Sequence, residues 1–322
     1  MPEISLTAIF NTLVFIAITT VLGWFFRKKN WVDRHVQSGL MRLVIWVFTP
    51  CLILDRVLGN PLITEFSVVW KVCAAGILSV TVGILLALFL ARFFGIDDTA
   101  RRRAFAYCCG FYNYGYIALP ICMSLCPSDT VGVMLLFNSS IDVTVWSVGV
   151  ALITGKIRPA EMLKSAVNPI TFAMIFCLVC NFSGAARFVP AWVFDAGASL
   201  GACMVPCGIL LIGMSLPVLL NGFRVRDEPL VSAGAMLIRL VLVPIVMVAA
   251  AVLVPALPQD LRFVLVIEAG MPAAMIPIIV LQYYGSDARL ALRITLSTSA
   301  ACLVTLPFWI KFGFRILAAL QS

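Results

Sequence analysis

The chain has 322 residues, of which 62% are hydrophobic and only 12% are charged, and its mean hydropathy is +1.07. A soluble domain carries about 25% charged residues, so this composition excludes an ordinary soluble protein and predicts an all-α polytopic membrane protein. The net charge of +8 would suit nucleic acid, but basic residues of membrane proteins concentrate in cytoplasmic loops. We therefore expect membrane lipid, and no nucleic acid, as a partner.

Ten apolar segments are predicted to span the membrane. The first should remain as a span, because no basic region precedes it and no small-residue cleavage site follows it. Their approximate ranges are 4–26, 37–58, 68–92, 104–126, 131–154, 167–184, 191–220, 230–254, 260–284 and 289–314. The polar breaks between them are short, so no separate soluble domain is expected.

The positive charges of alternate loops predict the orientation. One set of loops holds Arg27, Lys28, Lys29, Arg34, Arg92, Arg101, Arg102, Arg103, Lys156, Arg158, Lys164, Arg224, Arg226, Arg289 and Arg293. The other set holds only Lys71, Arg187 and Arg262, with Lys311 and Arg315 in the C-terminal segment. Because Lys and Arg are enriched on the cytoplasmic side, the first set is expected there. Both termini are then extracytoplasmic, in the cell (inner) membrane.

The two halves of the chain resemble each other. "RAFAYCCGFYNYGYIALPICMSLCPSD" (103–129) is echoed by "RFVLVIEAGMPAAMIPIIVLQYYGSD" (262–287), with Gly and Pro breaks inside the fourth and ninth spans. The shift between the halves is five spans, an odd number, so they should lie in opposite orientations. We expect two inverted repeats, 1–154 and 167–322, joined by a cytoplasmic linker at 155–166. Interrupted spans at matching positions indicate a transporter's substrate site.

The interrupted spans carry the candidate substrate-binding residues. The fourth span supplies Asn113, Gly115 and Pro120, and the ninth supplies Gly270, Met271, Pro272 and Pro277. A broken helix in lipid needs partners for its freed backbone groups, and the positive ends of the half-helices attract a carboxylate. The alternative is a packing kink, with Asn113 bonded to a neighbouring helix.

Two acidic residues inside spans are candidates for binding a coupling ion. Asp142 lies at the centre of the fifth span and Glu268 just before the break of the ninth. Ionisable groups in a membrane are costly and usually functional, so either residue can carry a proton or help bind sodium. The competing interpretation is that one of them pairs with Arg239 of the eighth span.

Catalytic and metal chemistry find little support in the sequence. His35 is the only histidine, which argues against a histidine-based metal site or catalytic triad. Cys177 and Cys180 have a redox-like spacing, but inside a membrane helix such cysteines usually pack. Phosphate-binding, dinucleotide-binding and zinc-protease motifs are missing. We expect no enzyme activity, no cofactor and no metal.

Several short stretches together are similar to one family. They are Asn113 with Pro120 in the fourth span, "NPITFA" (168–173), "DAGASLG" (195–201), "IGMSLPVLL" (212–220), "EAGMPAAMIP" (268–277) and "LVTLP" (303–307). With these landmarks the chain resembles the auxin efflux carrier family, which includes the plant PIN proteins and bacterial relatives. The short segment 155–166 resembles the bacterial members, whereas plant PINs have a large loop there.

The resemblance implies a fold and a function. The fold would be that of sodium/proton antiporters and bile-acid transporters, with spans 1, 2, 6 and 7 as a scaffold and spans 3–5 and 8–10 as a moving transport unit. It also implies elevator-type alternating access, a homodimer, and an organic anion as substrate, either auxin-like or a dicarboxylate such as malate or malonate. Asn168 would be a further substrate contact.

Glu268 and Asp142 depart from the plant proteins, so plain transport of an auxin-like anion is not the only hypothesis. One alternative is a sodium- or proton-coupled carrier of another solute on the same fold. The alternative from another class is a membrane sensor that does not transport.

Overall fold

The computed structural model describes residues 6–156, 168–220 and 227–320, and within them the regular structure is helical. Most of the predicted linker 155–166 lies outside the described residues. The first half contains α1 (Leu6–Lys28), α2 (Arg34–Leu43), α3 (Thr49–Val57), α4 (Phe66–Leu90), α5 (Thr99–Gly110), α6 (Ala118–Leu125), α7 (Ser128–Thr144) and α8 (Val150–Thr154). The second half contains α10 (Pro169–Ser183), α11 (Ala191–Gly201), α12 (Met204–Leu219), α13 (Pro229–Leu237), α14 (Val243–Leu253), α15 (Gln259–Ala269), α16 (Ile276–Tyr283) and α17 (Ala288–Ala319).

Wider π turns join consecutive helices at three places in the described chain. They are η1 (Val44–Phe48) between α2 and α3, η4 (Val145–Gly149) between α7 and α8, and η6 (Ile238–Leu242) between α13 and α14. A π turn inserts an extra residue into a helix and often marks a functional position. The turn η6 contains the buried Arg239.

Six of the described helical segments are long and apolar enough to cross a membrane: Thr7–Lys28, Phe66–Phe94, Ser128–Thr154, Ala191–Leu219, Pro229–Leu253 and Ala288–Ala319. The other predicted spans differ from these for local reasons. The fourth and ninth are each divided into two short helices, α10 has only 15 residues, and the second begins with the polar sequence of α2. The protein is therefore a helical, multi-pass membrane protein.

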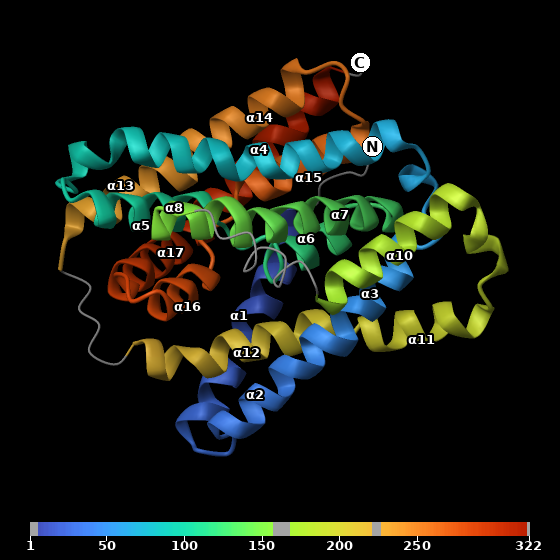
Figure 1. Ribbon diagram of the computed structural model, residues 1–322, viewed down its shortest axis with the longest axis horizontal. Helices are drawn as coiled ribbons and strands as arrows, with labels where there is room; N and C mark the ends of the chain where they lie inside the picture. The colour runs from blue at the N-terminus through green and yellow to red at the C-terminus, as the bar shows by residue number, and fades with distance from the viewer. Residues whose placement is uncertain (1–5, 157–167, 221–226, 321–322) are drawn as a thin grey trace.

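The helices pack in two groups, which meet where α3 contacts α7 and where α1 contacts α6. In one group, α1 packs on α12, and α3 packs on α10 and α11. In the other, α4 packs on α5 and α7, α14 on α15, and α13 on α17, while α7 contacts α15 and α5 contacts α17. In Figure 1, α4, α5 and α7 run across the upper part of the molecule, and α2, α3, α11 and α12 lie below them.

The contact between α1 and α12 is unusually close because glycines lie in it. A Cβ atom at Gly213 would lie 2.1 Å from the carbonyl oxygen of Thr20, and one at Gly23 would lie 2.3 Å from the carbonyl oxygen of Leu210. Small residues allow helix backbones to approach closely, which is how helices associate in a membrane. These glycines therefore fix the spacing of the two helices.

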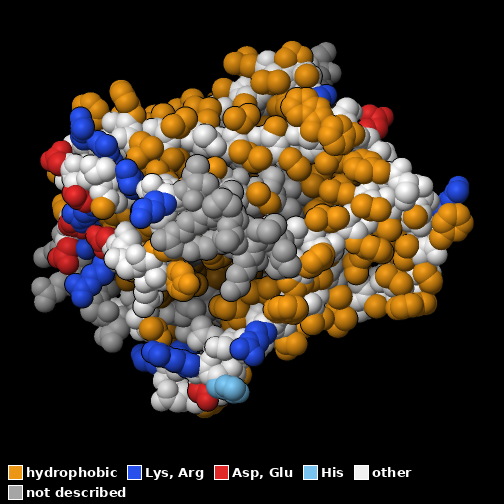
Figure 2. All heavy atoms as spheres, viewed as in Figure 1, with side chains coloured by type: hydrophobic (Ala, Val, Ile, Leu, Met, Phe, Trp, Pro, Cys, Tyr) orange, Lys and Arg blue, Asp and Glu red, His pale blue; other side chains and the backbone are white. Residues whose placement is uncertain are grey.

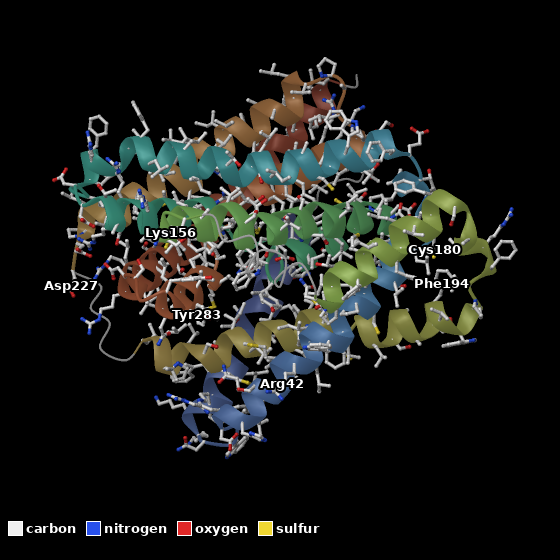
Figure 3. The ribbon with its side chains drawn as sticks, in the orientation of Figure 1. Arg42, Lys156, Cys180, Phe194, Asp227 and Tyr283 are labelled. Atoms are coloured by element: carbon white, nitrogen blue, oxygen red, sulfur yellow. The ribbon has the colours of Figure 1, made fainter. Side chains whose placement is uncertain are left out.

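Charged side chains gather toward one edge of the molecule. Arg101 at the start of α5 forms ion pairs with Glu228 and, at 3.4 Å, with Asp287, and Arg293 lies 3.4 Å from Glu228 and 3.8 Å from Asp227. Figure 3 places Asp227 at the left edge of the molecule, and Figure 2 shows blue and red side chains at that edge, with hydrophobic ones covering most of the remaining described face. The cluster joins the beginnings of α5, α13 and α17.

Candidate functional site

Two irregular segments cross where α5 and α15 end. Residues 111–117 separate α5 from α6, and residues 270–275 separate α15 from α16. The N–H of Asn113 donates to Pro272 O at 2.8 Å, and the N–H of Ala274 donates to Phe111 O at 3.0 Å. Tyr112 and Ala273 thereby form an isolated antiparallel bridge. Each broken helix satisfies backbone groups of the other, which permits two breaks inside a membrane.

The prolines explain where the helices resume. Pro272 lies inside the second segment, where its ring nitrogen has no hydrogen to donate. Pro120 and Pro277 do not lie in the irregular segments; they belong to the first turns of α6 and α16, respectively. Amide hydrogens of a first turn have no partner within the helix, so proline costs little there. Both prolines therefore lie in the first turn of a half-helix, where they do not interrupt it.

The half-helices present their N-terminal ends at the crossing. Both α6 and α16 have 8 residues, and neither N-cap residue, Ile117 or Met275, makes a side-chain capping bond. The positive end of a helix dipole attracts anions, and uncapped amide groups can donate to them. The two ends are chemically suited to a carboxylate.

Asn113 and Gly115 are the candidate residues with access to space at the crossing. Both are partly exposed, and a Cβ at Gly115 would meet nothing within 4 Å. The Oδ1 atom of Asn113 accepts a hydrogen bond from the N–H of Tyr116 at 3.1 Å. The other candidates of the crossing, Gly270, Met271 and Pro272, are buried. The candidate residues of the first segment are therefore more exposed than those of the second.

Asn168 occupies a different structural position. It is the N-cap of α10, and its Oδ1 accepts a hydrogen bond from the N–H of Thr171 at 2.9 Å. The helix α10 packs on α3 rather than on the half-helices. This geometry gives Asn168 a capping role, which its preference for the start of a helix explains.

Asp142 belongs to a set of contacts by which α7 holds the first segment. Its carboxylate accepts a hydrogen bond from the hydroxyl of Tyr114, and Asn138 Nδ2 donates to Tyr114 O at 3.0 Å. Asp142 thus contacts Tyr114 and not Arg239. The helix α17 holds the second segment in a similar way, because Thr298 Oγ1 accepts from the N–H of Ala273 at 3.1 Å and Thr295 Oγ1 donates to Ala274 O at 2.8 Å.

Arg239 and Glu268 are both fully buried beside the crossing. Arg239 donates to backbone carbonyls of Glu268, Ala269 and Met271, and its guanidinium lies 4.0 Å from the centre of the Tyr112 ring. The two oxygens of the Glu268 carboxyl have no hydrogen-bond partner among the described residues. Arg239 therefore lies beside Glu268, but its hydrogen bonds go to backbone carbonyls at the end of α15 rather than to the Glu268 carboxyl.

Sequence reasoning missed several residues that shape the site. Asn138, Thr295 and Thr298 bind the crossing segments, and the hydroxyl of Tyr112 forms a 2.7 Å hydrogen bond with Ser79 of α4. The available signal was weak: each is a polar residue inside an apolar helix, where a partner is expected. Such residues are too common in spans to identify a site alone.

Comparison with known proteins decides the family. The family model described as "Membrane transport protein" matches residues 8–161 and 153–310. The chain belongs to this family. The resemblance to auxin efflux carriers predicted from the sequence motifs is thereby confirmed.

A relative from Methanothermobacter thermautotrophicus, described as an uncharacterized transporter, agrees with this result. It is 24% identical over 308 residues, which cover 93% of this chain and 96% of the relative. Together, the family and the relative indicate a membrane transporter rather than an enzyme.

Proposed function

We propose that the protein is a secondary transporter of a small organic carboxylate anion, either an auxin-like monocarboxylate or a dicarboxylate such as malate or malonate. The substrate binds at the crossing of residues 111–117 and 270–275. Asn113 and Gly115 line its accessible side, Pro120 and Pro277 lie in the first turns of the half-helices that face it, and Gly270, Met271 and Pro272 form the buried side. Asn168, which caps α10, is a further substrate contact implied by the family resemblance.

The observation that carries the proposal is the pair of uncapped half-helix N-termini at one crossing. The short helices α6 and α16 both begin there, without side-chain caps, next to the partly exposed Asn113. Broken helices whose N-terminal ends point at an anionic substrate group are the usual substrate site of inverted-repeat transporters. Asn113 adds an amide that can both donate and accept hydrogen bonds.

The packing supports a division into a scaffold and a transport unit. The scaffold comprises α1–α3 and α10–α12, and the transport unit comprises α4–α8 and α13–α17. Between them the crossing leans on α12, where a Cβ at Gly208 would lie 2.1 Å from Cε1 of Tyr116. Elevator movement, in which the transport unit slides along the scaffold, would require this ring to leave Gly208.

The packing also supports ten spans in two inverted repeats. The contact of α1 with α12 corresponds to that of α10 with α3 when the chain is shifted by five spans. The same shift relates two further pairs of contacts. The contact of α4 with α5 corresponds to that of α14 with α15, and the contact of α4 with α7 corresponds to that of α13 with α17. We place the charged edge in the cytoplasm of a cell with both termini outside, and we propose a homodimer on the family resemblance.

A ligand screen followed by uptake tests this function. Purified protein is heated with mono- and dicarboxylates, and a carboxylate that binds the native state is expected to raise its melting temperature by mass action. The best ligand is then offered, radiolabelled, to sealed proteoliposomes. Accumulation that empty liposomes lack is the expected result. Binding without accumulation would favour the non-transporting sensor, and no response to any carboxylate would reject the substrate class.

A proton-coupled carrier is the second candidate, because of the Glu268 carboxyl. Its two oxygens are fully buried and have no hydrogen-bond donor among the described residues. Burying an ionised carboxylate without donors costs free energy. The positive charge of Arg239 offsets part of that cost, and uptake of a proton by Glu268 removes the negative charge itself. Glu268 is therefore suited to carry a proton with the substrate.

Replacing Glu268 by Gln is expected to abolish stimulation of uptake by an imposed pH gradient, while carboxylate binding persists. The amide keeps the shape of the side chain but cannot exchange a proton. Uptake into proteoliposomes is measured with and without the gradient. Asp142→Asn serves as the comparison, because an amide oxygen can still accept the hydrogen bond from Tyr114. Equal stimulation in Glu268→Gln and the unmodified protein would assign Glu268 a structural role.

A further inference from the structure

Arg239 binds the end of a helix rather than another side chain. Its Nε donates to Met271 O at 2.8 Å, and its Nη2 donates to Glu268 O at 2.9 Å and to Ala269 O at 3.5 Å. These carbonyls lie where α15 ends at Ala269 and the chain turns into the crossing segment, and Glu268 O also accepts a hydrogen bond from the N–H of Met271 at 3.2 Å. One guanidinium group therefore gathers carbonyls at the end of the half-helix, while its Nη1 has no hydrogen-bond partner among the described residues.

The same carbonyl oxygens are of the kind that binds a small cation. The C-terminal end of a helix carries partial negative charge, and freed carbonyls of broken helices coordinate sodium in transporters. Glu268 adds a buried carboxyl near them: its two oxygens have neither a hydrogen-bond partner nor an ion pair with Arg239 in the described chain, but they lie within electrostatic reach of the guanidinium. Carbonyl and carboxylate oxygens are the ligands that hard cations prefer.

The aromatic ring of Tyr112 covers another side of the Arg239 guanidinium. On the side of the first crossing segment the guanidinium lies 4.0 Å from the centre of this ring, an arrangement that stabilises a cation. Tyr112 is itself held by its hydrogen bond to Ser79. Arg239 is 0% exposed, so its positive charge lies permanently between the two crossing segments, where a free ion would have to enter and leave.

We propose that Arg239 is a tethered cation that occupies a monovalent-cation site formed by the end of α15 and the Glu268 carboxyl. The crossing then has its positive charge built in, and the protein needs no sodium at this position. This proposal goes beyond the proposed function, which concerns the carboxylate substrate. It concerns the cation that would bind at the end of α15 if Arg239 were absent.

Thermal stability in two salts tests the proposal without any substrate. The unmodified protein is expected to melt at the same temperature in NaCl and in choline chloride of equal ionic strength. Arg239→Ala should melt lower in choline chloride, and sodium or millimolar guanidinium should restore it. Saturating cation should raise the melting temperature of this variant by about 5 °C, the effect of a ligand that binds only the folded state.

Two further variants make the test specific. Arg262 also binds backbone carbonyls at the end of a helix, donating to Ala251 O at 2.8 Å and Val254 O at 3.0 Å, but it lies partly exposed. Arg262→Ala loses comparable bonds and is expected to show no response to sodium. Adding Glu268→Gln to Arg239→Ala should remove the sodium response, because the site then lacks its carboxylate.

Several results would overturn the proposal. One is unmodified protein that sodium stabilises more than choline; another is folded Arg239→Ala that responds to neither sodium nor guanidinium. Recovery of folded Arg239→Ala only from buffers that contain sodium or guanidinium would support the proposal.

Arg239→Lys provides the test if Arg239→Ala cannot be recovered in any buffer. A folded Arg239→Lys protein whose melting temperature does not depend on sodium supports a tethered charge, and one whose melting temperature depends on sodium contradicts it. A failed carboxylate screen leaves all these measurements unaffected.

Discussion

Replacing Asn113 by Ala is expected to weaken carboxylate binding by roughly 10- to 100-fold while the protein remains folded in the membrane. A hydrogen bond to a charged group contributes about 1.5–3 kcal/mol, which corresponds to that change in affinity. The substitution also removes the Oδ1 acceptor of the Tyr116 N–H, so the crossing segment loses a local restraint. The backbone bond from Asn113 to Pro272 remains available. Thermal-shift titrations and proteoliposome uptake measure the effect.

Asn181→Ala is the matched control for this prediction. Asn181 lies in α10, where its Nδ2 donates to Val57 O at 2.8 Å and its Oδ1 accepts from the N–H of Gly59 at 2.8 Å. Its loss is expected to lower stability and leave the affinity unchanged. If Asn113→Ala retains full affinity, or if both variants lose affinity equally, Asn113 does not contact the substrate.

Replacing Gly213 by Ala is expected to destabilise the protein strongly. The new methyl group would lie 2.1 Å from Thr20 O and 2.9 Å from the backbone nitrogen of Trp24, so it would meet backbone rather than a movable side chain. The helices α1 and α12 must then separate. Overpacking of a close contact typically costs about 1–3 kcal/mol and sometimes more. The melting temperature and the yield of monodisperse protein in detergent report the loss.

Replacing Gly39 by Ala is expected to stabilise the protein, in contrast to the same substitution at Gly213. Gly39 lies inside α2, is exposed, and would give a Cβ with nothing within 4 Å. Alanine is favoured over glycine in a helix by up to about 1 kcal/mol. A small rise in melting temperature is expected for Gly39→Ala. Two equal responses would mean that the contact of α1 with α12 is looser than described.

The sequence predicted the interrupted helices because their cause is local. Glycine and proline weaken a helix wherever they occur, so the breaks near Asn113 and Pro272 could be found without a structure. The alignment of Tyr112 with Ala273 could not, because it depends on how two distant segments meet. The number of membrane spans is harder to establish than the position of the breaks. Interrupted or partly polar helices fall below the length and hydropathy expected of a single span, so six described segments meet those criteria where ten spans were predicted.

Arg239 shows the limit of reasoning from side-chain types. A buried arginine suggested a carboxylate partner, and both Asp142 and Glu268 were available. The structure gives it backbone carbonyls instead, and a carbonyl is the same in every residue, so no sequence pattern marks it. The threonines of α17 were missed for the same reason, since they too bind backbone groups of the crossing.

The backbone bonds of the crossing also bear on how the protein is made. Asn113 and Pro272 lie far apart in the chain, so the ribosome delivers the first segment to the bilayer well before its partner exists. An unpaired amide or carbonyl in hydrocarbon costs several kcal/mol. The newly synthesised first half therefore cannot settle its broken helix in lipid alone. We therefore expect it to stay near water, head groups or the insertion machinery until α15 and α16 arrive, so that the joining of the two halves comes late in folding.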